Sequence, residues 1–129
     1  MNTEPKIYIV DDDESVCRAL GRLLKSAGYC ARAFNSAQSF LDSINTGAYG
    51  ILILDICMPE MGGFQLQEKL NQLRSGLQVI LITAHAQTGY RERAMDSGAR
   101  GFLNKPFGDE ELLTLIRSLT EGNQPDQGE

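Results

Sequence analysis

The sequence has few long apolar runs, and none approaches the roughly 18 consecutive apolar residues that a membrane-spanning helix requires. Its first residues, MNTEPK, contain no basic region leading into an apolar stretch, so they do not have the pattern of a secretory signal peptide. These two absences predict a cytoplasmic protein that neither crosses a membrane nor leaves the cell by that route.

Cysteine is also scarce. The three cysteines, Cys17, Cys30 and Cys57, are odd in number and contain no C-x-x-C pair. This pattern fits neither a disulfide framework nor a zinc site, and it favours a reducing compartment.

Basic residues are outnumbered. The chain has 12 Lys and Arg against 17 Asp and Glu, a net charge of −5. Because affinity for nucleic acid depends on clustered cations, the domain alone is not expected to bind DNA. A length of 129 residues, with 42% hydrophobic and 22% charged residues, indicates one globular domain with a single core.

Short apolar runs alternate with amphipathic segments of helical period, which predicts an α/β fold. Strands are expected over 7–10, 29–34, 50–55, 78–83 and 101–104. Helices are expected over 16–27, 36–44, 62–73, 88–97 and 109–121, with Ser36 and Asp109 as N-caps and Gly28 and Gly98 at C-terminal ends. Residues 1–121 would form the domain, and 122–129 a polar tail or the start of a linker.

Two of the expected strands, 50–55 (GILILD) and 78–83 (QVILIT), are apolar without alternation. Such runs are typical of central parallel strands covered by helices on both faces. Arg32 in the second strand indicates an edge position instead. Strands and helices in alternation predict a doubly wound parallel sheet of five strands with five helices, in which ligands bind at the carboxyl ends of the strands.

Polar residues occupy these strand ends. Asp11–Asp13 follow the first strand, while Asp55, Thr83 and Lys105 close the third, fourth and fifth. The aspartate run alone would more often be a solvated turn or a helix start, but its convergence with Asp55 and Lys105 favours a site. Clustered carboxylates repel one another and raise a pKa unless a cation is present, and oxygen ligands suit Mg²⁺.

The same residues predict a chemistry. With Mg²⁺ bound, an ionised Asp55 is an oxygen nucleophile towards phosphorus, Lys105 neutralises phosphoryl oxygens and Thr83 donates a hydrogen bond to them. Positioning and electrostatics suffice for phosphoryl transfer, so His85 is not needed as a base.

Four segments, IYIVDDDESV, ILILDICMPEMGG, LITAH and FLNKPF, together resemble the signature blocks of bacterial response-regulator receiver domains, over residues 6 to 120. The resemblance implies a flavodoxin-like strand order, 2-1-3-4-5. It also implies that Asp55 is the phosphoacceptor and that Asp11 and Asp12 are the acidic pair, with Asp12 a direct Mg²⁺ ligand and Asp13 outside the pair. The backbone carbonyl of Cys57 would be a further ligand.

The resemblance assigns three further positions. Thr83 matches the switch hydroxyl, Phe102 the switch aromatic residue and Lys105 the phosphate-binding lysine, with Lys105-Pro106 a cis peptide. Cys57 and His85 each lie two residues after a site residue, and we hypothesise that their side chains set the lifetime of the phosphorylated state.

The function implied is a switch rather than a turnover enzyme. A sensor histidine kinase would donate the phosphoryl group, and the domain would assist its own phosphorylation and dephosphorylation. The face formed by 88–97, 101–104 and 109–121 would then support a phosphorylation-dependent homodimer or an output contact. The blocks most resemble receivers of transcription regulators with a C-terminal helix-turn-helix domain.

Three alternatives use a related fold. A haloacid-dehalogenase-like phosphatase would need a second aspartate two residues after the nucleophile, where Cys57 stands. A flavodoxin-like flavin carrier would need phosphate donors after the first strand, where three carboxylates would repel a phosphate. A single-domain phosphorelay protein would share the site but have no output module.

Overall fold

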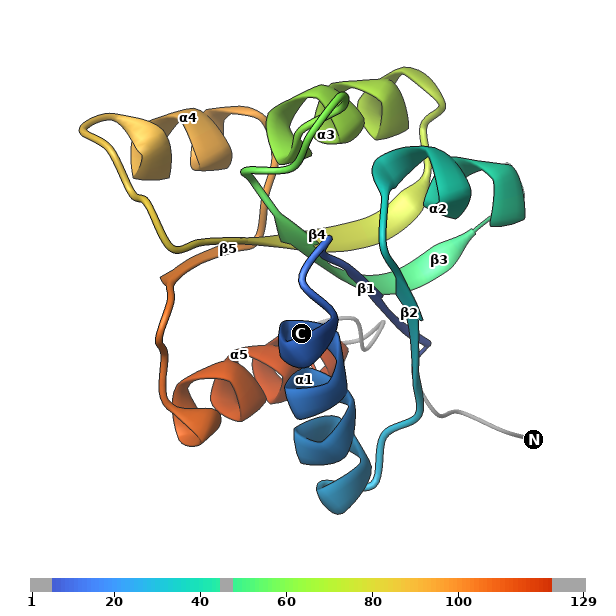
Figure 1. The fold of residues 1–129 in the computed structure, drawn as a ribbon, viewed down its shortest axis with the longest axis vertical. Coiled ribbons are helices and arrows are strands. Elements are labelled where there is room, and N and C mark those ends of the chain that lie inside the picture. The colour runs from blue at the N-terminus through green and yellow to red at the C-terminus, as the bar shows by residue number, and fades with distance from the viewer. Residues whose placement is uncertain (1–5, 45–47, 122–129) are drawn as a thin grey trace, which may run out of the picture.

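The computed structural model describes residues 6–44 and 48–121, which form a five-stranded parallel sheet covered by helices on both faces (Figure 1). The strands are β1 (Ile7–Val10), β2 (Ala31–Phe34), β3 (Tyr49–Asp55), β4 (Gly76–Thr83) and β5 (Gly101–Asn104). Their order in the sheet is β2-β1-β3-β4-β5, which confirms the predicted topology and the edge position of the Arg32 strand. The tail predicted at 122–129 lies outside the described residues.

The helices are α1 (Glu14–Ser26), α2 (Ala37–Ser43), α3 (Gly63–Gln72), α4 (Tyr90–Asp96) and α5 (Asp109–Glu121). Helices α1 and α5 cover one face of the sheet, and α2, α3 and α4 cover the other (Figure 1). No helix in the described part of the chain is long and apolar enough to span a bilayer.

The central strand β3 shows why its sequence is apolar without alternation. Ile51 and Ile53 pack into the core beneath α1 and α5, while Leu52 and Leu54 pack into the core beneath α2, α3 and α4. All four side chains are at most 1% exposed. Because both faces of β3 are covered from Ile51 onward, every position from Ile51 to Asp55 is buried, and the Asp55 carboxylate lies in a largely apolar environment.

Element ends agree with the prediction to within two residues except in details of capping. Gly28, after α1, has φ +92° as its predicted C-terminal place requires, and Ser36 Oγ caps α2 by accepting from the Ser39 N–H at 3.0 Å. Asp109 is not the N-cap predicted: it is the first residue of α5, and the Leu112 N–H donates to Gly108 O at 3.3 Å. The Gly108 N–H is bound instead by Glu111 Oε1 at 3.4 Å, an acceptor from within the first turn.

Candidate functional site

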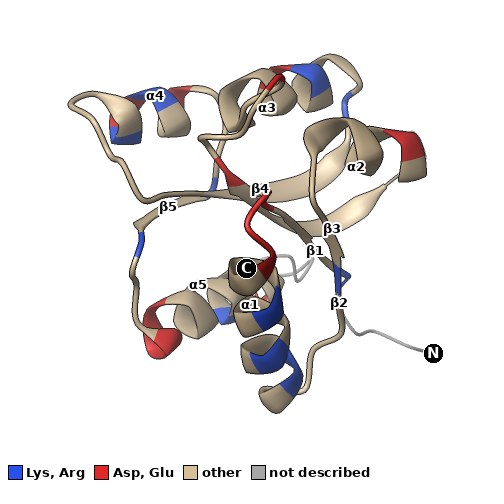
Figure 2. Cartoon of the chain, in the orientation of Figure 1, with Lys and Arg blue, Asp and Glu red and all other residues tan. Residues whose placement is uncertain are grey.

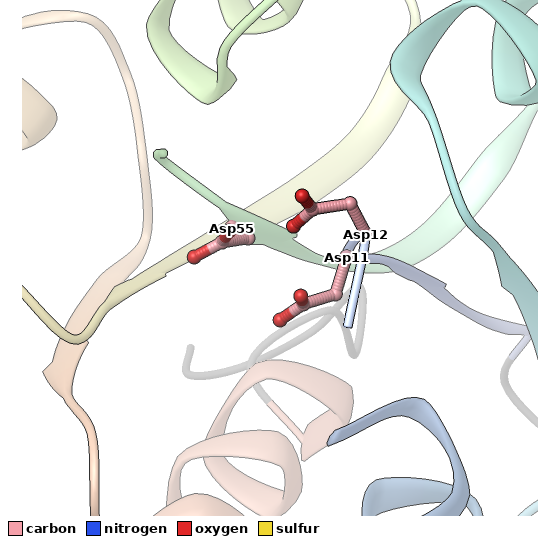
Figure 3. Close-up of side chains that lie close together, drawn as sticks. All are labelled: Asp11, Asp12 and Asp55. Carbon is pink, nitrogen blue, oxygen red and sulfur yellow. The ribbon is translucent and has the colours of Figure 1, made fainter. Parts of the chain in front are cut away.

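The site lies where β1 and β3 end beside one another. Val10 and Leu54 are register partners, so Asp11 and Asp55 emerge from neighbouring strands at the same edge of the sheet. Asp11 is fully buried, Asp55 is 4% exposed and Asp12 is exposed. One ligand oxygen from each of the three lies within 4.8 Å of the others, and the carboxylates point to the same side (Figure 3). The strand-end acids are therefore brought together.

Lys105 provides the cation at this cluster. Its Nζ lies 2.9 Å from Asp11 Oδ2 and 3.3 Å from Asp55 Oδ1. The residue follows β5, where its N–H donates to Thr83 O at 2.8 Å and its bond to Pro106 is cis, as the resemblance implied. Figure 2 shows the acidic segments at the ends of β1 and β3.

The charged groups of the cluster shift the pKa values of Asp55 and Lys105. Burial, and next the charge of Asp11, raise the pKa of Asp55 from 3.8 to about 6, although Lys105 opposes the rise. Burial acts to lower the pKa of Lys105, but the hydrogen bond and charge of Asp11, and then Asp55, outweigh it and raise that pKa. The ionised cluster thus carries more negative charge than one ammonium compensates, as the strand-end pattern predicted.

Asp13 is turned away from the cluster. Its Oδ1 accepts from the N–H and the hydroxyl of Ser15 at 2.9 and 2.6 Å, capping α1, and these bonds lower its pKa. Asp13 is therefore the N-cap of α1, which agrees with its exclusion from the acidic pair.

Thr83, Cys57 and His85 form a second group of site residues, at the ends of β3 and β4. Thr83 ends β4 and is fully buried; its Oγ1 accepts from the His85 N–H at 3.1 Å and lies 3.8 Å from Cys57 Sγ. The side chains of Cys57 and His85 belong to exposed residues. The bond from His85 uses only the oxygen of the Thr83 hydroxyl, and either Thr83 or Cys57 is the donor in the contact between those two side chains.

Phe102 does not join the charged cluster. It lies in the middle of β5, is 5% exposed and packs in the core beneath α2, α3 and α4. The Arg91 guanidinium of α4 lies 5.2 Å from the centre of its ring. The aromatic side chain therefore contacts the helix that follows Thr83 rather than the acids themselves.

The sequence analysis did not identify one residue that shapes the site. Gly63, the first residue of α3, donates its N–H to Ile56 O at 2.9 Å, and a Cβ on it would lie 2.6 Å from Asp55 O. Only glycine lets α3 approach the end of β3 so closely. The Gly62-Gly63 pair at the start of the expected helix is the sequence feature that could have indicated this close approach.

The donor set suits a hard divalent cation. Three carboxylates converge, and burial together with the charge of Asp11 raises the pKa of Asp55, so a bound cation would favour its ionised form. Oxygen ligands of this kind fit Mg²⁺.

The comparisons with known proteins agree on one family. The model of the response regulator receiver domain matches residues 7–117. The response regulator protein TodT of Pseudomonas putida is 43% identical over 112 residues, which are 87% of this chain and 49% of TodT. The transcriptional regulatory protein FixJ of Bradyrhizobium diazoefficiens is 34% identical over 125 residues, 97% of this chain and 61% of FixJ.

Solved structures give the same result. The response regulator StyR matches with a TM-score of 0.85 and 40% identity, covering 93% of this chain and 61% of StyR. FixJ-N matches with a TM-score of 0.84 and 32% identity, covering 94% of this chain and 96% of FixJ-N. The chain spans about half to three fifths of the length of these curated relatives. It belongs to the response regulator receiver family, whose members are phosphorylation-dependent switches of two-component signalling.

Proposed function

We propose that Asp55 is the residue phosphorylated in this domain, and that Asp11, Asp12, Asp55 and the backbone carbonyl of Cys57 hold the Mg²⁺ that the reaction requires. The observation that carries the proposal is the convergence of three carboxylates on one point, with Lys105 Nζ 2.9 and 3.3 Å from two of them. A structural ion pair would need one acid, whereas this arrangement concentrates charge around one nucleophile.

A carboxylate oxygen of Asp55 attacks the phosphorus of a phosphohistidine, so that a P–O bond forms as the donor's P–N bond breaks and the donor histidine departs. Lys105 is within reach of Asp55 and turns to an oxygen of the transferred group. Thr83 donates its hydroxyl to another oxygen of that group. Bound Mg²⁺ supplies positive charge that offsets the carboxylates and the phosphoryl oxygens.

The response to phosphorylation would pass through Thr83 and Phe102. Thr83 is joined through residues 84–89 to α4, and Arg91 of α4 lies over Phe102. A phosphoryl group that draws in the Thr83 hydroxyl therefore changes the surroundings of the aromatic ring. Cys57 and His85, which both contact Thr83, would set how long the phosphoryl group remains on Asp55 before it is hydrolysed.

The partners follow from this role. A sensor histidine kinase is the donor, and α4, β5 and α5 form the face that changes and pairs with a second copy. The function is that of a switch in transcription regulation, as the name of FixJ supports, and not of an enzyme that turns over a separate substrate. The cysteines Cys17, Cys30 and Cys57 are all free, which supports a reducing cytoplasmic location.

The assignment is tested by incubating the protein with Mg²⁺ and acetyl phosphate and measuring its intact mass. We expect one base-labile phosphoryl group in the wild type and in Asp13→Asn, whose changed residue caps α1 outside the cluster. We expect none in Asp55→Asn. An undiminished adduct in Asp55→Asn would refute the proposal.

A further inference from the structure

One carbonyl at the end of α4 receives two side-chain amides from α3. Gln67 Nε2 and Asn71 Nδ2 each lie 2.9 Å from Ser97 O. Gln67 and Asn71 are four residues apart and so share one face of α3, which runs beside α4 in Figure 1. Ser97 is the C-cap of α4, and its carbonyl has no partner within that helix, so the two amides satisfy both of its lone pairs.

The rest of α4 is attached by less directional contacts. The helix has seven residues, of which only Ala94 is buried. Its N-cap, Gly89, has φ +89° and makes no side-chain capping bond. Near that end the Tyr90 and Phe64 rings meet edge to face with centroids 5.5 Å apart, and Arg93 lies 3.9 Å from the Phe64 ring centre. Ring contacts tolerate sliding and rotation, whereas paired hydrogen bonds fix a position.

Packing alone does not account for Gln67. The residue is 2% exposed, and its Oε1 is buried without a partner in the described residues. A methionine of similar size would fill the space without burying an unpaired oxygen. What the glutamine contributes is therefore its donor, and that donor is directed at Ser97 O.

The two ends of α4 are thus tied to different parts of the site. The N-terminal end follows Thr83 through residues 84–89. The C-terminal end is fixed to α3, which is itself held at the end of β3 by the bond from the Gly63 N–H to Ile56 O. We propose that Ser97 is the pivot of α4, and that Gln67 and Asn71 are positioning residues that hold the pivot while the N-terminal end moves with Thr83. This rests on the proposed function, which supplies the movement at Thr83.

Amide NMR with beryllofluoride and Mg²⁺, a mimic of an aspartyl phosphate, tests the pivot. In the wild type we expect chemical-shift changes to be large over 84–90 and to decline to near zero at 97–99. In the double variant Gln67→Met with Asn71→Ala, we expect the changes to extend through 97–99. Gln72→Ala removes an exposed amide of the same helix, for which the described residues show no hydrogen bond, and should keep the wild-type gradient. An unchanged gradient in the double variant would overturn the proposal.

Hydrogen exchange in the unphosphorylated protein tests the pivot without relying on phosphorylation. We expect the amides of Ser97, Gly98 and Ala99 to exchange about five- to tenfold faster in Asn71→Ala and in the double variant, the scale of one net hydrogen bond. Equal exchange in wild type and variants would refute the pivot. If beryllofluoride failed to shift the Asp55 and Thr83 amides, the proposed function would be contradicted, while the exchange result would still decide on Ser97.

Discussion

At the residue scale, the site contains two buried carboxylates, Asp11 and Asp55, and one ammonium group, that of Lys105, lies between them. Asp11 is fully buried and Asp55 is 4% exposed, and both depend on Lys105. A buried carboxylate without a cation costs several kcal/mol, so the metal-free domain is strained at the position where the chemistry takes place. Under the proposed function, we expect this excess of negative charge to make the stability of the domain depend on Mg²⁺, pH and phosphorylation.

Asp55→Asn should therefore stabilise the metal-free domain at neutral pH. The folded-state pKa of about 6 exceeds the unfolded value of 3.8, so the stability contributed by Asp55 is complete below about pH 4 and is lost as the pH rises through 6. The full loss corresponds to at most roughly 3 kcal/mol, which the variant avoids. Urea denaturation with a chelator should show the gain at pH 7 and not at pH 4; a variant no more stable at pH 7 would contradict the pKa.

Mg²⁺ affinity should decline in acid. Because Asp55 must be ionised to ligate and its pKa is about 6, affinity should fall by about tenfold for each pH unit below that value. Titration calorimetry at several pH values measures the change. A constant affinity between pH 5 and 7 would show that the Asp55 carboxylate is not a ligand.

Lys105→Met should destabilise the metal-free domain by about 2 to 4 kcal/mol, since it leaves two buried carboxylates without a cation. Mg²⁺ should restore part of the loss, because it supplies positive charge to the same carboxylates. Lys69→Met, which removes an exposed cation of α3, is the matched control and should change the free energy of unfolding by much less. Equal losses in the two variants would show that the charge of Lys105 does not stabilise the two buried carboxylates.

At the element scale, the close approach of α3 to β3 is the feature that shapes the loop after Asp55. Gly63→Ala would place a Cβ 2.6 Å from Asp55 O and 2.8 Å from Ile56 Cα, so we expect a loss of roughly 2 kcal/mol or more and slower phosphorylation. Gly21→Ala, in α1, meets nothing within 4 Å and should instead stabilise by about 0.5 to 1 kcal/mol. Thermal unfolding of both variants makes the comparison, and a Gly63→Ala protein as stable as the wild type would show that the loop can yield.

The elements themselves were largely predictable because local pattern and tertiary burial agree. The unbroken apolar runs of β3 and β4 indicated a covered parallel sheet, and the sheet then brought Asp11, Asp55 and Lys105 together. What the pattern could not supply were contacts between distant parts of the chain. Gln67 and Ser97 O are 30 residues apart, and nothing in either segment indicates the other. The cap of α5 was predicted one residue late: Asp109 lies inside the helix, and the Gly108 N–H donates to Glu111 Oε1 from the first turn.

At the scale of the whole molecule, phosphorylation at one edge of the sheet should change association at the α4, β5 and α5 face. We expect sedimentation to show a dimer only in the beryllofluoride-loaded protein. Met95→Glu, on α4 and 48% exposed, should weaken that dimer without reducing phosphorylation. Leu73→Glu, equally exposed but just after α3, is the control and should leave the dimer intact. A dimer insensitive to Met95→Glu would place the interface elsewhere.

The whole account depends on where the phosphoryl group is attached, and chemical trapping measures this most directly. Borohydride reduces an aspartyl phosphate to homoserine, which peptide mass spectrometry locates in the chain. After treatment with acetyl phosphate and Mg²⁺, we expect homoserine at position 55 and at no other aspartate, including Asp11, Asp12 and Asp13. Homoserine at one of those positions, or none at position 55 in a protein that carries a base-labile phosphoryl group, would contradict it.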